Sequence, residues 1–153
     1  MADNSTHLTH LKLLATFYVR EALCGLDAAS VQEVIRPGAM TTAPHAPPEV
    51  AGIINLRGRI VTIVDSGIKL AYGRTAAGGD NRVFIFEDGS EFIGLLVDRV
   101  GEVVEVESGA EEPLPANMRP AQARYFTGVS RVGGRVIALL NAAEMLAAGH
   151  NPA

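Results

Sequence analysis

Side chains that could bind a metal ion or carry out catalysis are few and widely spaced in this sequence. The histidines are His7, His10, His45 and His150. Only His7 and His10 are close enough along the chain to act as neighbouring ligands, and they precede the strand-forming part of the sequence. We therefore expect no metal site.

The candidate nucleophiles also lack the sequence context that catalysis requires. Cys24 is the only cysteine, which excludes an intrachain disulfide and a cysteine-based zinc cluster, and its strand position favours a small buried side chain. Ser30 and Ser66 are not framed by the glycines of a GxSxG motif. Gly78-Gly79 is not followed by the GK[ST] ending of a phosphate-binding loop. These patterns predict a protein that is not an enzyme and has no cofactor.

The composition is that of a folded globular protein. The 153 residues are 48% hydrophobic and 20% charged, and 13 basic against 17 acidic residues give a net charge of −4, which disfavours nucleic-acid binding. The start lacks signal-peptide features and the apolar runs are far shorter than the ~20 residues of a membrane span, so we expect a cytoplasmic protein. One domain is predicted over residues 13–149, with a flexible arm over 1–12 and a tail over 150–153.

Short apolar segments separated by turn residues predict a mostly β protein. The predicted turns are Arg20-Glu21, Arg57-Gly58, Asp88-Gly89 and Gly133-Gly134. Asp65 is a candidate N-cap for a short helix over 66–71, and Asn141 for a final helix over 142–148. Residues 107–120 contain several prolines and are expected to form a long irregular connection.

The sequence also contains an internal repeat. Residues 52–65, GIINLRGRIVTIVD, align without gaps on residues 128–141, GVSRVGGRVIALLN. The alignment places the turn glycines Gly58 and Gly134 together and also superposes the two helix caps. A second ungapped match lies upstream in both copies, and chance similarity rarely yields two such matches in the same order.

This second match pairs residues 24–35, CGLDAASVQEVI, with residues 93–104, IGLLVDRVGEVV. It superposes Glu33 on Glu102. The repeat units therefore span about 17–71 and about 83–148, each with a hairpin, a strand, a loop, a second hairpin and a short helix. Such units favour small β-barrels, whose closure removes exposed strand edges.

Positions filled differently in the two copies are freer to serve function than positions filled alike. Arg57 faces Gly133, so the turn itself needs no long side chain there, and a guanidinium at a hairpin tip is an available donor fork. Asn55 faces Arg131 and is likewise expected to be unconstrained by the fold. Glu33 faces another glutamate, which leaves a structural and a functional role equally open.

Residues 50–65, VAGIINLRGRIVTIVD, resemble the signature of the CheW domain of bacterial chemotaxis. Residues 25–35, 94–103 and 127–146 are also similar to that family, so the resemblance covers about 14–148. In this family the acidic cap is commonly followed by a Leu-Arg type continuation. Here Asp65 is followed by Ser66-Gly67, which predicts a weak helix start.

The resemblance implies two packed, five-stranded, SH3-like β-barrels and an adaptor without catalytic activity. Its implied partners are the regulatory domain of a CheA-type histidine kinase and the cytoplasmic tip of chemoreceptors, in arrays at the inner face of the membrane. The implied partner-binding residues are Val31, Glu33, Gly52, Asn55, Arg57 and Gly58. Arg57 is expected to anchor a groove near the junction of the two barrels.

Other functions remain open from the sequence alone. The adaptor could serve a pilus, gliding or biofilm pathway. A regulatory β-barrel that binds a small ligand, or a β-barrel enzyme, are alternatives from other functional classes. Melting shifts caused by a small ligand without any kinase would favour the regulator. Turnover of a substrate would favour the enzyme.

Overall fold

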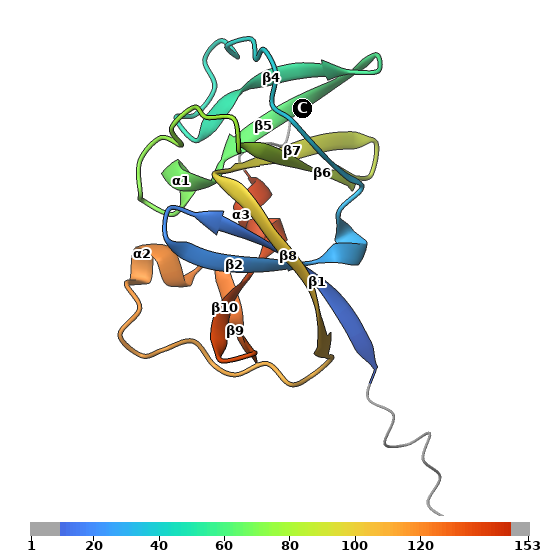
Figure 1. The fold of residues 1–153 in the computed structure, drawn as a ribbon. Coiled ribbons are helices and arrows are strands. Elements are labelled where there is room, and N and C mark those ends of the chain that lie inside the picture. Colours follow the sequence, from blue (N-terminus) through green and yellow to red (C-terminus); the bar gives the residue numbers. More distant parts are fainter. Residues whose placement is uncertain (1–9, 148–153) are drawn as a thin grey trace, which may run out of the picture.

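Two five-stranded sheets packed on each other make up the described part of the chain, residues 10–147 of a computed structural model (Figure 1). The first sheet has the strand order β8-β1-β2-β10-β9 and the second β3-β6-β7-β5-β4. The strands are β1 (Leu11–Val19), β2 (Ala22–Asp27), β3 (Glu33–Ile35), β4 (Val50–Leu56), β5 (Arg59–Asp65), β6 (Arg82–Asp88), β7 (Glu91–Val97), β8 (Arg99–Glu107), β9 (Phe126–Val132) and β10 (Arg135–Leu140).

The two repeat units exchange strands between the sheets. The first sheet takes the β1–β2 hairpin from the first unit and β8, β9 and β10 from the second. The second sheet takes the β6–β7 hairpin from the second unit and β3, β4 and β5 from the first. Each sheet therefore contains strands from both units, so neither sheet is built from one unit alone.

The register of the central parallel pairs repeats in both sheets. Gly25 of β2 pairs with Leu139 of β10, and the matching Gly94 of β7 pairs with Ile63 of β5. A Cβ atom at Gly25 would lie 2.8 Å from a side-chain carbon of Ile137, and one at Gly94 would lie 2.6 Å from a side-chain carbon of Ile63. Both glycines are therefore required by close packing inside a sheet.

The strand order does not close either sheet into a barrel among the described residues, which corrects the expectation of closed barrels. A single bridge to a loop residue covers each outer hairpin strand instead. Thr41 pairs with Ile53 of β4, and Glu112 pairs with Val129 of β9, with N···O distances of 2.8–2.9 Å. These bridges satisfy part of the backbone that an open edge leaves unpaired.

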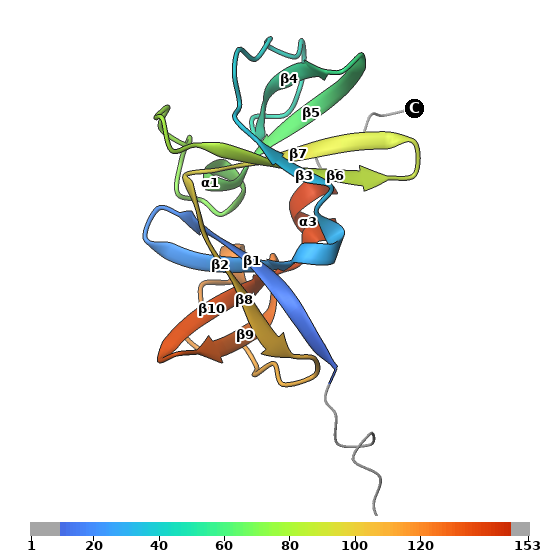
Figure 2. The same cartoon turned by 45° about the vertical axis from the view of Figure 1, so that its right-hand side comes forward.

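The largest hydrophobic cluster lies between the sheets and joins them. Phe17 of β1 contacts Phe84 of β6 in an edge-to-face arrangement with ring centroids 5.2 Å apart. Cys24 and Met145 are completely buried in the same cluster. Met145 belongs to α3 (Ala142–Leu146), which lies between the two sheets in Figure 2. A smaller separate cluster lies in each sheet, around Ile63 and Val83 in the second and around Leu14 and Ile137 in the first.

The predicted helix caps are confirmed. Asp65 caps α1 (Ser66–Lys69) by accepting hydrogen bonds from the N–H groups of Gly67 and Ile68, and Asn141 caps α3 by accepting from Glu144. Both helices end earlier than predicted, and residue 148 lies outside the described residues. Two further short helices are η2 (Ala28–Ser30) and α2 (Pro120–Ala123). The second begins at the last residue of the predicted irregular connection, because proline is favoured at the first helical position.

One predicted boundary changes, at the N-terminal end. The expected flexible arm over 1–12 is too long, because β1 begins at Leu11, which pairs with Glu107 of β8. The remainder of that arm, residues 1–9, and the predicted tail over 150–153 lie outside the described residues. None of the described helices is long and apolar enough to span a membrane.

Candidate partner-binding site

The β4–β5 hairpin turn holds both of its residues in the left-handed conformation. Arg57 has φ 52° and Gly58 has φ 85°, while the matching Gly133 and Gly134 have φ 56° and 78°. Two successive positive φ values are typical of the two-residue turn that suits twisted hairpins. Glycine adopts this conformation freely and arginine rarely does, so the turn gives no structural reason for an arginine at position 57.

Asn55 stabilises this turn. Its side-chain oxygen accepts a hydrogen bond from the N–H of Gly58, at 2.8 Å. The expectation that the fold leaves Asn55 unconstrained is therefore wrong. Comparison of the two copies obscured this contact, because the matching residue, Arg131, pairs with Glu112 instead.

Arg57 forms an ion pair and a hydrogen bond with Glu33 of β3. The hydrogen bond, followed by the charge of the carboxylate, raises the pKa of the Arg57 guanidinium, which stays cationic. The side chain of Arg57 is 70% exposed and that of Glu33 is 33% exposed. The pair links the β4–β5 turn to β3, the opposite edge of the second sheet.

A groove of about 190 Å³ surrounds this ion pair. Its lining residues are Glu33, Leu56, Arg57, Arg59 and Phe92. The Arg59 guanidinium lies 4.5 Å from the centre of the Phe92 ring, and Leu56 and Phe92 pack against the interior of the second sheet. All five residues belong to the second sheet or its turn. The groove therefore takes no lining residue from the first sheet, and its expected position near the junction of the two sheets stays a prediction.

The first sheet has a related but different ion pair. Glu102, which matches Glu33, accepts from Arg135 at 3.5 Å. Arg135 matches Arg59 and not Arg57. The glutamate thus contacts a hairpin arginine in both copies, which supports a shared structural role. An arginine in the turn occurs only in the β4–β5 hairpin, since the matching β9–β10 turn has Gly133.

Of the six residues expected to bind a partner, four lie together and two lie elsewhere. Asn55, Arg57 and Gly58 form the turn, and Glu33 contacts it. Gly52 lies near the start of β4, where a Cβ atom would be 2.8 Å from the carbonyl oxygen of Thr41 in the edge bridge. The matching Gly128 has the same relation to Glu112. Val31 ends η2 and packs against the cluster between the sheets.

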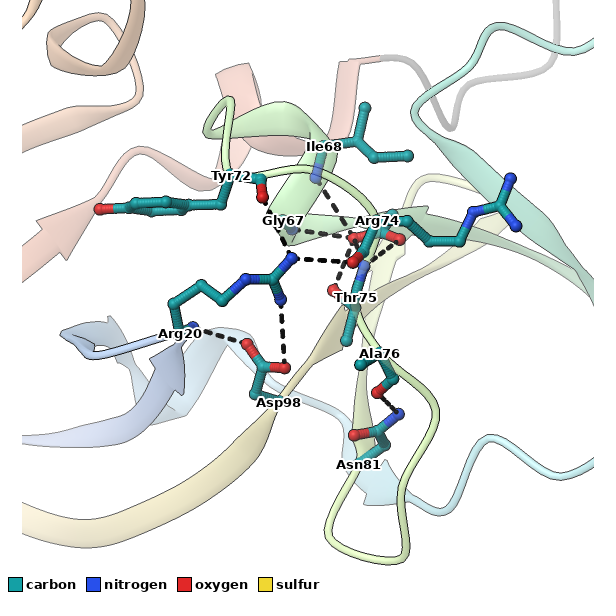
Figure 3. Close-up of polar contacts among 10 residues, drawn as sticks. Arg20, Gly67, Ile68, Tyr72, Arg74, Thr75, Ala76, Asn81 and Asp98 are labelled. Carbon is teal, nitrogen blue, oxygen red and sulfur yellow. Dashed lines mark hydrogen bonds and ion pairs between the residues drawn. The ribbon is translucent and has the colours of Figure 1, made fainter.

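A second arginine with a positive φ, Arg20 in the β1–β2 turn, lies where the two sheets meet (Figure 3). Its N–H donates to a carboxylate oxygen of Asp98 at 2.6 Å, and its guanidinium lies 3.6 Å from the other oxygen. The guanidinium also donates to the carbonyl oxygens of Tyr72 and Arg74, at 3.1 and 2.9 Å. Arg20 therefore fastens the first sheet to the loop after α1.

Sequence reasoning missed Arg20, although the repeat contained the signal. Extending the upstream alignment by a few residues places Arg20 on Gly89, which has φ 63° against 55° for Arg20. This is the same exchange of arginine for glycine that drew attention to Arg57.

The loop fastened by Arg20 is also held by Asp65. This buried carboxylate accepts hydrogen bonds from the N–H and hydroxyl of Thr75, at 3.0 and 2.6 Å, in addition to capping α1. A Cβ atom at Gly67 would overlap the carbonyl oxygen of Gly73. Ser66-Gly67 therefore does not prevent the helix from starting, and Gly67 gives the returning loop the space it needs (Figure 3).

The buried thiol of Cys24 is unsuited to nucleophilic chemistry. Removal from water raises the pKa of Cys24 to about 12, so the reactive thiolate is scarce at neutral pH. Among residues 10–147, no three histidine, cysteine, aspartate or glutamate side chains converge as metal ligands.

The sequence profile of the CheW-like domain family matches residues 14–149. The chain belongs to the CheW-like domain family. It is 29% identical over 141 residues to the chemotaxis protein CheW of Rhizobium meliloti, covering 92% of this chain and 91% of that protein. It is 28% identical over 122 residues to the chemotaxis protein CheW of Klebsiella aerogenes, covering 80% of this chain and 74% of that protein.

A solved structure supports the same assignment. The scaffolding protein TtCheW from Thermoanaerobacter tengcongensis superposes with a TM-score of 0.77 at 30% identity, covering 88% of this chain and 87% of that one. The predicted fold class and family are thereby confirmed. This CheW-like chain is a non-catalytic adaptor of a chemosensory system, and its partners are proteins of a chemosensory array.

Proposed function

We propose that this CheW-like chain couples a CheA-type histidine kinase to chemoreceptors, and that Arg57 is central to the contact. The exposed Arg57 guanidinium supports this proposal most directly, since the turn that carries it would be better served by glycine. The adaptor then works in the cytoplasm, beside receptor arrays at the inner face of the membrane.

The chemistry around Arg57 suits a protein partner. A guanidinium has five N–H donors in a planar fork, and one nitrogen, Nη2, bonds Glu33. The remaining donors are available to a carboxylate or to backbone carbonyls of a partner. Ile60, three residues further along β5, is 62% exposed and provides apolar surface near the turn. An arginine next to apolar surface is a common composition of binding hot spots.

Replacing Arg57 with glycine tests the proposal. The Arg57→Gly variant should fold normally, because glycine is the residue at the matching turn position. Its affinity for the kinase regulatory domain or for a receptor tip should fall at least tenfold, about 1.4 kcal/mol. Titration calorimetry with each purified partner measures this change.

Arg131→Ala is the matched control. Arg131 is 66% exposed and pairs with Glu112 in the first sheet, so it resembles Arg57 in exposure and in having an acidic partner. Its loss should leave both affinities unchanged. Normal binding by Arg57→Gly, or an equal loss in the two variants, would remove Arg57 from the contact.

A further inference from the structure

A second cavity, of about 620 Å³, lies beside α1 and shares no residue with the Arg57 groove. The proline-containing segment 40–51 forms one wall, and α1 with the loop 74–77 forms another. The apolar part of the lining includes Met40, Pro47, Ile68 and Leu96. The volume falls within the range of small-molecule sites, about 300–1,000 Å³. An apolar lining is also typical of such sites.

The loop wall of this cavity is held in place by side-chain hydrogen bonds (Figure 3). Arg20 bonds the carbonyl oxygen of Arg74, and Asp65 bonds both donors of Thr75. The Asn81 side chain donates to the carbonyl oxygen of Ala76 at 3.0 Å. Three successive residues of the wall are thus held by side-chain hydrogen bonds, two of them from residues that do not line the cavity, which lowers the ordering cost of binding a ligand.

The polar groups of the lining provide donors but few free acceptors. Asp65 is 2% exposed, and its oxygens already accept from Gly67, Ile68 and Thr75. The Arg74 side chain is exposed and forms no ion pair within residues 10–147. It points away from Arg20 and Asp98 in Figure 3. The cavity therefore combines one uncompensated cation with an apolar wall.

We propose that this cavity binds an aliphatic monocarboxylate. The carboxylate pairs with the Arg74 guanidinium, whose planar fork matches its two oxygens, and the hydrocarbon chain lies along Met40, Pro47, Ile68 and Leu96. An amine ligand would find no free carboxylate, because the oxygens of Asp65 are already bonded. A polyanion would face a single arginine and an apolar wall.

Titration of the full-length protein with octanoate, octanol and octylamine tests the ligand chemistry. Octanoate should bind at least tenfold more tightly than the other two by calorimetry. Amide chemical-shift changes should concentrate in segments 40–51 and 74–77. Equal binding of octanoate and octanol, or shift changes elsewhere, would overturn the proposal.

Variants test the role of Arg74. Arg74→Gln should weaken octanoate binding at least tenfold without lowering the melting temperature, because the contacts that hold residue 74 use its backbone. Ala77→Glu places an acid on an exposed position of the lining and should weaken binding to a similar extent. Arg119→Gln, at an exposed arginine that does not line the cavity, is the control. Unchanged octanoate affinity in Arg74→Gln would exclude this site.

The outcome is independent of the proposed coupling function, since kinase and receptor binding are measured on Arg57 variants without any carboxylate present. A carboxylate next to an apolar group could come from a small fatty acid or from the C-terminus of a peptide. A short peptide with an apolar C-terminal residue and a free carboxyl group distinguishes these two sources. Binding of that peptide with no binding of octanoate would overturn the small-molecule assignment.

Discussion

The two repeat units place different residues at matching positions, and the differences fall into two kinds. Arg20 and Arg57 both replace a turn glycine of the other copy, Gly89 and Gly133, and both hold a left-handed backbone. Arg20 uses its side chain to join the two sheets, through Asp98 and two carbonyl oxygens. Within residues 10–147 the guanidinium of Arg57 pairs with Glu33 alone, and its side chain stays exposed. A difference between copies therefore marks a specialised residue, and its contacts decide whether the role concerns stability or binding.

Among matching positions, we expect the two helix caps to differ most in their contribution to the free energy of unfolding. Asp65→Ala should lower the free energy of unfolding by about 3 kcal/mol, because it leaves several buried donors of Gly67, Ile68 and Thr75 without an acceptor. Asn141→Ala removes one hydrogen bond to Glu144 and should cost about 1 kcal/mol. Urea unfolding of both variants measures the two values, and equal losses would show that the loop contacts of Asp65 contribute nothing.

The turn glycines should instead behave alike. Gly58→Val and Gly134→Val each force a β-branched residue into a positive φ and should each cost about 2 kcal/mol. Apart from the chain neighbours, no atom of the described residues lies within 4 Å of an added Cβ at either site, so we expect the cost to come from backbone strain. Thermal melts compare them directly. A difference of more than about 1 kcal/mol would mean that the two turns are not structurally equivalent.

The Arg20→Gly variant tests whether Arg20 serves stability, in contrast to the binding role proposed for Arg57. The lost side-chain contacts, namely the ion pair with Asp98 and the hydrogen bonds to the carbonyl oxygens of Tyr72 and Arg74, should outweigh the relieved backbone strain, for a net loss of about 1–2 kcal/mol. The backbone N–H of residue 20 keeps its hydrogen bond to Asp98 in the variant. Kinase and receptor binding should be unchanged. Urea unfolding checks the first expectation and calorimetry the second. A variant as stable as the wild type would assign Arg20 no role in joining the sheets.

Local signals in the sequence predicted the hairpins and caps, because turn residues and N-caps act over a few positions. The turn predicted at Arg57-Gly58, for example, is observed between β4 and β5. The exchange of strands between sheets was not predictable in this way, since pairing of β3 with β6 depends on contacts between distant residues.

The candidate site could be predicted only in part, because some of its contacts are local and others join distant residues. The contrast between Arg57 and Gly133 is visible in the repeat, whereas the contact with Glu33 depends on how the second sheet curves. The Asn55 bond to Gly58 is local, but comparison of the copies obscured it, because the matching Arg131 pairs with Glu112 instead. The place of the groove, lined by residues of the second sheet alone, follows only from the three-dimensional arrangement.

The smallest predicted effects concern the exchange of residues between the turns. Arg57→Gly should raise the free energy of unfolding by up to about 1 kcal/mol, since glycine relieves the positive φ and an exposed ion pair contributes little. Gly133→Arg should lower it by a similar amount, because the new arginine is strained and its nearest matching glutamate, Glu102, already contacts Arg135. Neither change should alter the slope of urea unfolding, as both lie on exposed turns.

A double variant carrying both exchanges should be as stable as the wild type, because the sites lie in different sheets and should act independently. It should also bind the kinase and receptor as weakly as Arg57→Gly alone. Restored binding in the double variant would mean that an arginine on either turn suffices, and that the second sheet is not the specific contact surface.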